Sequence, residues 1–196
     1  MTESELLLKN VRNKVELTPS EEEEFLACFK RTIIKKKQFI VQPEFVAKYR
    51  TYIVKGAFRG YVIGDEGEEH TISFAIDDWW TSDIDSYVNQ KPSTMFVVAL
   101  EDCTVLQIDY KKEEELKASN PKFERLFRIQ AEKGMAFLQK RLISNLTQSA
   151  EERYEHFLQN YSQFVNRVPQ YALASFLNMT TEYLSRIRNK RVQTNS

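Results

Sequence analysis

The sequence predicts an α+β fold in three consecutive parts: a roll of short β-strands, one long helix and a helical tail. Three observations support this prediction. Short apolar runs rich in Val, Ile, Phe and Tyr fill about 33–108, a helical repeat of apolar residues covers about 121–146, and two short helices separated by a polar turn follow at 171–191. A chain of 196 residues is long enough to bury a core.

A helix is expected before the strands, over about 19–30 in "LTPSEEEEFLACF". Thr18 suits the N-cap, Pro19 the first helical position, and Glu21 stands three residues after the cap. The acidic run that follows faces the positive end of the helix dipole and is interpreted as a solvated helix start.

The strand-rich part reads "QFIVQ", "KYRTYIVKGAFRGYVIGDEGEEHTISFAI" and "STMFVVALEDCTVLQID". Its apolar runs alternate partly and are interrupted by "KGAFRG", "GDEGEE" and "LEDC", which is typical of strands joined by tight turns, with "GDEGEE" as a hairpin. So many short strands favour a double-stranded β-helix of the jelly-roll or cupin-like type over a βαβ layout.

The segment from Pro121 to about 146 contains no further proline and predicts one long helix. Ile129, Ala136 and Ile143 are seven residues apart, and Leu126 lies on the same broad face. The face is widened by Met135, Phe137, Leu142 and Leu146. Such a face favours a seam with a second copy of the chain, although packing on the same chain is the alternative. Ser149, with Glu152 three residues on, then caps another helix.

The stretch "YALASFLNMTTEYLSRIRNKR" has the spacing of a helix-turn-helix. Ala174 is the small residue where two helices meet, Asn178 tolerates the positive φ of the turn, and Leu184 and Ile187 are the inner contacts of the second helix. Thr180 is a natural N-cap for that helix.

One outward stripe of the second helix is polar and suits contact with base edges, because Arg can bond guanine and Glu can accept from cytosine. The candidate DNA-binding residues are Thr180, Thr181, Glu182, Ser185, Arg186, Arg188, Asn189 and Lys190. Residues 161–196 hold five cations and one acid, a local net charge of +4, whereas the whole chain is neutral with 28 residues of each sign. The plainer alternative is an amphipathic helical hairpin with a solvated polar face.

The sequence resembles the Crp/Fnr superfamily of bacterial transcription regulators over nearly its whole length. "VKGAFRGYVIGDEGEEHTISF" is similar to the family's roll, "ALEDCTVLQID" to its closing strands and "RVPQYALASFLNMTTEYLSRIR" to its DNA-binding helices. The resemblance implies a cyclic-nucleotide-binding-like sensor roll (1–118), a dimerisation helix (119–147) and a winged helix-turn-helix (148–196). It also implies that Glu182 and Arg186 read bases, with Thr180 or Thr181 on phosphate.

The effector site departs from the cyclic-nucleotide-binding members of that family. Pro92 stands where the resemblance places an arginine, Lys91 is the only cation nearby, and Asp83 and Asp85 add negative charge. Cyclic AMP is therefore not expected to bind, and the sequence identifies no effector. The candidate pocket residues are Trp80, Ser82, Lys91, Ser93 and Thr94.

Composition argues against other classes of protein. Two cysteines and two histidines, with His70 beside only two glutamates, make a poor metal site, so neither an enzyme nor a metal or cofactor is expected. The N-terminus lacks a signal peptide and "MFVVAL" is too short to span a bilayer, so a cytoplasmic protein with no membrane contact is expected. The expected partners are double-stranded DNA and a second copy of the chain, with RNA polymerase a further candidate. A sensory module whose tail binds a partner protein is the alternative.

Overall fold

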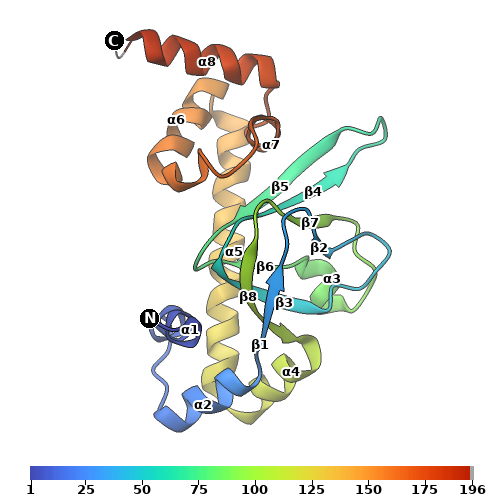
Figure 1. Cartoon of the computed structure of the whole chain (residues 1–196), viewed down its shortest axis with the longest axis vertical. Helices are drawn as coiled ribbons and strands as arrows, with labels where there is room; N and C mark the ends of the chain where they lie inside the picture. Colours follow the sequence, from blue (N-terminus) through green and yellow to red (C-terminus); the bar gives the residue numbers. More distant parts are fainter. Residues whose placement is uncertain (195–196) are drawn as a thin grey trace.

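The long helix α5 (Pro121–Thr147) runs along the length of the molecule, and the other elements lie beside it (Figure 1). The strands lie along one side of α5 and reach as far as Arg141, two N-terminal helices lie near its start, and the tail helices gather at its far end. The chain is represented by a computed structural model that describes residues 1–194. Residues 195–196 of the expected C-terminal unit lie outside this range.

Two capped helices begin the chain. Helix α2 (Pro19–Ala27) confirms the expected cap, since Thr18 and Glu21 exchange the two hydrogen bonds of a capping box; the helix ends slightly earlier than predicted. Helix α1 (Glu3–Arg12) was not predicted. Thr2 and Glu5 form an identical capping box there, so the sequence did carry a local signal for α1.

The predicted series of strands is confirmed and forms two four-stranded antiparallel sheets, in the orders β1-β8-β3-β6 and β2-β7-β4-β5. The strands are β1 (Lys30–Ile34), β2 (Phe39–Val41), β3 (Tyr49–Lys55), β4 (Phe58–Ile63), β5 (Glu69–Ala75), β6 (Trp80–Thr81), β7 (Phe96–Ala99) and β8 (Cys103–Asp109). The expected hairpin at "GDEGEE" joins β4 to β5, with Gly67 at φ +87°. A short unpredicted helix, α3 (Ile84–Asn89), precedes β7.

Three apolar clusters hold these parts together. The first lies between the two sheets and includes Ile53, Phe58 and Val97. The second packs Tyr52 and its neighbours on β3 and β8 against α1, α2 and the start of α5. The third joins Phe74 at the end of β5 to the helical tail, so the tail is packed on the roll of its own chain.

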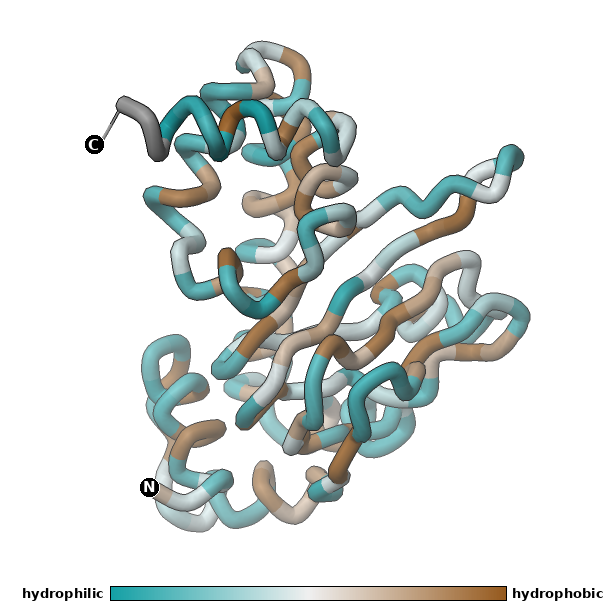
Figure 2. Tube along the Cα trace, turned by 45° about the horizontal axis from the view of Figure 1, so that its top comes forward, coloured by the Kyte–Doolittle hydropathy of each residue, from teal (hydrophilic) through white to brown (hydrophobic). Residues whose placement is uncertain are grey.

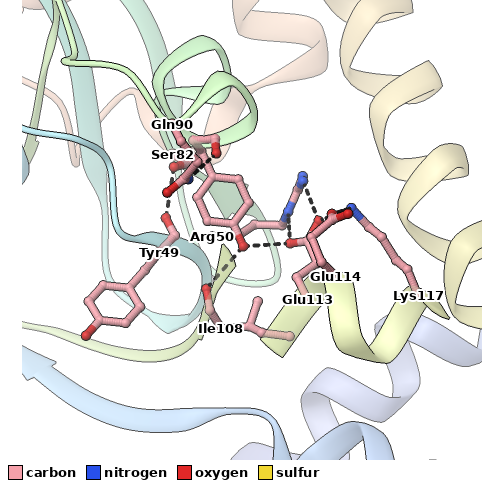
Figure 3. Close-up of polar contacts among 9 residues, drawn as sticks. Tyr49, Arg50, Ser82, Gln90, Ile108, Glu113, Glu114 and Lys117 are labelled. Atoms are coloured by element: carbon pink, nitrogen blue, oxygen red, sulfur yellow. Dashed lines mark hydrogen bonds and ion pairs between the residues drawn. The ribbon is translucent and has the colours of Figure 1, made fainter. Parts of the chain in front are cut away.

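Arg50 on β3 and Glu113 on α4 (Tyr110–Ser119) form a buried ion pair that fastens α4 to the roll (Figure 3). Nε and Nη2 of Arg50 donate to the two carboxylate oxygens at 2.7 and 2.9 Å, and the Tyr87 hydroxyl donates to Oε2 at 2.9 Å. Lys117 Nζ lies 2.6 Å from Oε1. Burial would raise the pKa of Glu113, but Arg50 and Lys117 outweigh it and hold that pKa below its usual value.

Helix α5 confirms the predicted long helix, but the residues expected to form the dimer seam do not all lie on its exposed side. Leu126 is 0 % exposed inside the second cluster and Ile129 is half-buried against it, so the roll and the N-terminal helices cover this part of the predicted face. Leu126 is therefore not available to a partner. Ala136 and Ile143 are exposed.

One apolar stripe of α5 is exposed and includes Met135, Leu142 and Leu146, three of the residues expected to widen the predicted face. Its residues follow one another at spacings of four, three, four and four, which keeps them on one side of the helix. They are Ala131, Met135, Leu138, Leu142 and Leu146. Leu146 is 76 % exposed and Met135 is 69 % exposed. No other part of the described chain therefore covers this stripe.

The tail contains α6 (Ala150–Asn160), a short 3-10 turn η1 (Ser162–Phe164), α7 (Gln170–Phe176) and α8 (Thr181–Thr194). The predicted capping box of Ser149 and Glu152 begins α6. No strand follows Asp109 in residues 110–194, so the wing expected beside the tail helices is not formed there. None of the described helices is both long and apolar enough to cross a bilayer.

Candidate nucleic-acid interface

Helices α7 and α8 and the turn between them form at the positions predicted. Ala174 is 1 % exposed where the helices meet, and Leu184 is 0 % exposed on the inner side of α8. Asn178 has φ +54°, which asparagine adopts more readily than most residues. The Met179 amide donates to the Ala174 carbonyl at 3.0 Å and closes the turn. Ile187 packs on the same apolar cluster as Ala174 and Leu184. The four positions that suggested a helix-turn-helix therefore have the burial or the backbone conformation that the spacing predicted.

Helix α8 begins at the predicted cap and presents a polar outer face. The Thr180 hydroxyl accepts from the Tyr183 amide at 3.2 Å. Glu182, Arg186 and Asn189 are exposed at positions i, i+4 and i+7, and Lys190 is exposed beside them. Figure 2 shows how hydrophilic α8 is at this end of the molecule. The outer face of α8 is defined below as Glu182, Arg186 and Asn189.

Three other candidate residues lie at the edge of this face or beneath it. Ser185 is half-buried, and its hydroxyl accepts from Gln170 Nε2 at 2.5 Å, so it joins α8 to the start of α7. Thr181 and Arg188 are also half-buried. The guanidinium of Arg186 lies 5.2 Å from the centre of the Tyr183 ring, which supports the arginine from below.

The local positive charge is smaller in space than in the sequence. Arg167 is paired with Asp77 at 2.6 Å and Glu101 at 2.5 Å on the roll, so it does not belong to the α8 surface. Arg191 is paired with Glu155 of α6 at 3.2 Å. Neither the roll carboxylates nor those of α6 could be placed beside these cations from local spacing. Arg167 and Arg191 therefore add little uncompensated positive charge to the surface of α8.

Helix α7 is docked directly on β5, a contact that no local sequence pattern predicts. The Ser175 hydroxyl accepts from the Thr71 amide at 2.8 Å and donates to the Glu69 carbonyl at 2.9 Å. Close by, the Phe74 and Phe176 rings are 5.2 Å apart. These contacts fix the orientation of the α7–α8 pair on the roll.

The position expected for an effector's phosphate is already occupied by the chain's own carboxylates. Asp83 caps α3 and is 6 % exposed, and it accepts from the Ser93 hydroxyl at 2.6 Å. Asp85 is paired with Lys91 at 2.8 Å. Ser93 and Lys91, the serine and the lysine at the expected phosphate position, are thus both engaged by acids.

The remaining effector candidates are Trp80, Ser82 and Thr94. Trp80 packs on Tyr52 and Phe29 in the second cluster, outside the space between the sheets, and its Nε1 donates to Asn10 Oδ1 at 3.2 Å. Ser82 donates to the Tyr49 carbonyl at 2.9 Å. Thr94 is exposed. The space between the sheets is filled by the apolar first cluster.

Comparison with known proteins shows similarity at the level of structure. No family model matches the chain, and no curated protein matches its sequence. FixK2 from Bradyrhizobium japonicum superposes with a TM-score of 0.76 at 15 % identity, over 85 % of this chain and 86 % of that one. A regulator described as belonging to the crp/fnr family, from Eubacterium rectale, gives 0.70 at 15 % identity over 90 % and 85 %. The chain has a Crp/Fnr-like fold.

A third structure covers a larger share of both chains. CLP from Xanthomonas campestris, described as a c-di-GMP responsive global regulator, gives a TM-score of 0.71 at 15 % identity, over 91 % of this chain and 93 % of that one. Such coverage spans the roll, the long helix and the tail, so the Crp/Fnr-like fold applies to the whole arrangement. At this level of identity the similarity concerns the fold, and residue roles have to be argued from the site itself.

Proposed function

We propose that the protein is a homodimeric DNA-binding transcription regulator. The observation that carries the proposal is the exposed outer face of α8, which follows a capped turn at the outer end of the tail. In a helix-turn-helix, this is the helix that lies in the major groove. The Crp/Fnr-like fold supports this interpretation, and we propose the division into 1–118, 119–147 and 148–196 on the same grounds.

The residues of the outer face have the chemistry of base readout. Arg186 would donate two hydrogen bonds to guanine, Glu182 would accept from cytosine, and Asn189 would pair with adenine. Thr180, Thr181, Arg188 and Lys190 would serve phosphates at the rim, with Ser185 contributing through its contact to Gln170. Because few cations surround α8, specific affinity should depend more on the outer face than on general charge.

The exposed stripe of α5 is proposed as the seam of the dimer. Met135, Leu138 and Leu142 follow one another at spacings of three and four residues, as the apolar positions of a coiled coil do. Ile143 and Ala136 lie at its flank, whereas Leu126 stays within the chain. Two copies joined there would set their α8 helices about 34 Å apart, one turn of B-DNA, and read a pseudo-palindrome. The roll would act by shifting this seam.

Leu138→Glu is expected to convert the dimer to a monomer, because a carboxylate would be buried without a partner in an apolar seam. Sedimentation equilibrium measures the change. Lys133→Gln is the matched control, since it alters the charge by the same amount at an exposed position of α5 outside the stripe. A wild-type protein that sediments as a monomer, or a Leu138→Glu variant that stays dimeric, would contradict the seam.

Cyclic AMP is expected not to bind, because the groups that would hold its phosphate are already bonded to carboxylates. The Ser93 hydroxyl donates to Asp83, and Lys91 is paired with Asp85. A calorimetric titration should show no saturable heat. A dissociation constant in the micromolar range or tighter would overturn this prediction.

DNA binding itself is tested by fluorescence anisotropy of a random duplex at increasing salt. We expect binding that weakens as salt rises, by about 0.9 log units per log unit of salt for each phosphate contacted. Failure to bind duplex at the lowest salt would contradict the proposal.

A further inference from the structure

A cavity of about 350 Å³ lies where α5, α6 and the end of α7 meet, outside the roll. Its volume is within the range of small-molecule sites. Aromatic side chains make much of its wall: Phe137, Phe157, Tyr161 and Phe176. Lys140, Arg141 and Arg153 also line it, and no aspartate or glutamate is among the described residues of the wall.

Two of these cations, both half-buried, differ from three other buried or half-buried arginines of the chain. Arg50, Arg59 and Arg167 each pair with a carboxylate. Arg153 instead donates to the carbonyls of Leu177, Gln148 and Asn178 at 2.8, 2.6 and 3.2 Å. Carbonyls satisfy the donors of a guanidinium but carry no full negative charge, so Arg153 contributes positive charge to this part of the wall.

Arg141 is the second of the two and has a donor to spare. Its Nη atoms donate to the carbonyls of Thr71, Ile72 and Phe176, and its guanidinium lies 4.2 Å from the centre of the Phe176 ring. Its Nε atom is buried and has no hydrogen-bond partner among the described residues. A buried unpaired donor is costly, so the hydrogen bonding of Arg141 is not fully satisfied within the described chain.

We propose that this cavity binds a small aromatic monoanion, with its ring among the aromatic side chains and its carboxylate near Arg141, Arg153 and Lys140. Aromatic walls favour a planar ring by edge and face contacts, and guanidinium groups favour carboxylates. Charge and shape therefore select the same class of ligand, one or two fused rings that carry one negative charge.

The location links the ligand to the tail. Arg141 bridges β5 and α7, and Arg153 holds the turn before α8 through Leu177 and Asn178. A bound anion would thus contact the two arginines that position α7 and α8. An effect on DNA affinity would rest on the proposed function, whereas the ligand site does not, so binding is measured without DNA.

The test is calorimetric titration of the full chain with 1-naphthoate and, as an uncharged probe of the same shape, 1-naphthamide. We expect saturable binding of naphthoate at one site per chain, at least tenfold tighter than that of the amide. No binding of naphthoate up to millimolar concentration, or equal binding of the two probes, would overturn the proposal.

Variants at the rim locate the binding without disturbing Arg141 or Arg153, whose loss would endanger folding. Ser144→Phe places a ring in the cavity and should abolish naphthoate binding, while Lys140→Gln should weaken it by about two- to fivefold, as for a partly exposed ion pair. Lys133→Gln, an equal charge change on α5 outside the wall, should leave it unchanged. Unaltered binding by the folded Ser144→Phe variant would refute this location.

Discussion

Glu113→Gln is expected to lower the free energy of unfolding by about 3 to 5 kcal/mol, because it leaves a buried guanidinium without its carboxylate. Arg50 is 8 % exposed and Glu113 is 0 % exposed, so little water is available to replace the lost charge. The amide keeps the size of the carboxylate, which limits the change to charge and hydrogen bonding. Urea denaturation followed by circular dichroism at neutral pH measures the difference.

Glu114→Gln is the matched control for that variant. Glu114 is the next residue, contacts the same Lys117 at 2.9 Å, and has 49 % of its side chain exposed. Its replacement should cost less than about 1 kcal/mol, as for other surface ion pairs. Equal losses of stability for the two variants would contradict the importance assigned to the buried pair.

The effect of Glu113 should also depend on pH in a defined direction. Its pKa is held below the usual glutamate value in the folded protein, so the pair stabilises the fold above the pKa of the unfolded chain, near 4.5. The stabilisation is lost as the pH falls through the lower, folded-state pKa. The difference between wild type and Glu113→Gln should therefore narrow with acidification from pH 4.5 downward.

Arg186→Ala is expected to weaken binding to the specific DNA site by about 1 to 3 kcal/mol, or roughly 5- to 150-fold, and to relax one base position. Arg186 is exposed on the outer face of α8 and is supported by the Tyr183 ring, so its loss removes a base contact and no packing in the core. Competition binding with site variants at each position measures both effects.

Lys190→Ala provides the comparison, because a phosphate contact should be lost equally on all sequences. It is expected to weaken specific and random DNA to the same degree and to reduce the dependence on salt. If Arg186→Ala gives the same uniform loss, Arg186 does not read a base.

The sequence predicted those parts of the fold that local patterns determine. The strand series, the "GDEGEE" hairpin, α5 and the capped turn before α8 all follow from alternation, helical spacing or a cap within a few residues. Helix α3 was not predicted because it has only 6 residues and lies between strands. Helix α4 was not predicted because it is highly charged, and Leu116 is its one buried apolar residue.

The sequence could not reveal which surfaces other parts of the chain cover. Leu126 has the spacing of a seam residue, but it is buried in a cluster with residues of α1 and α2, which lie about a hundred residues or more away. In the sequence, Arg167 adds to the positive charge of the tail, but in the structure it pairs with Asp77, which lies 90 residues earlier. The cavity behind α7 was missed for the same reason, because its wall combines three helices.

The most direct measurement is selection of genomic fragments by the purified full-length protein without added ligand, followed by sequencing. A dimer with two outward α8 helices should enrich a pseudo-palindrome whose half-sites lie about 10 base pairs apart, centre to centre. Retention of no DNA at all, under conditions in which the protein is folded, would contradict a DNA-binding regulator and favour a tail that binds a partner protein.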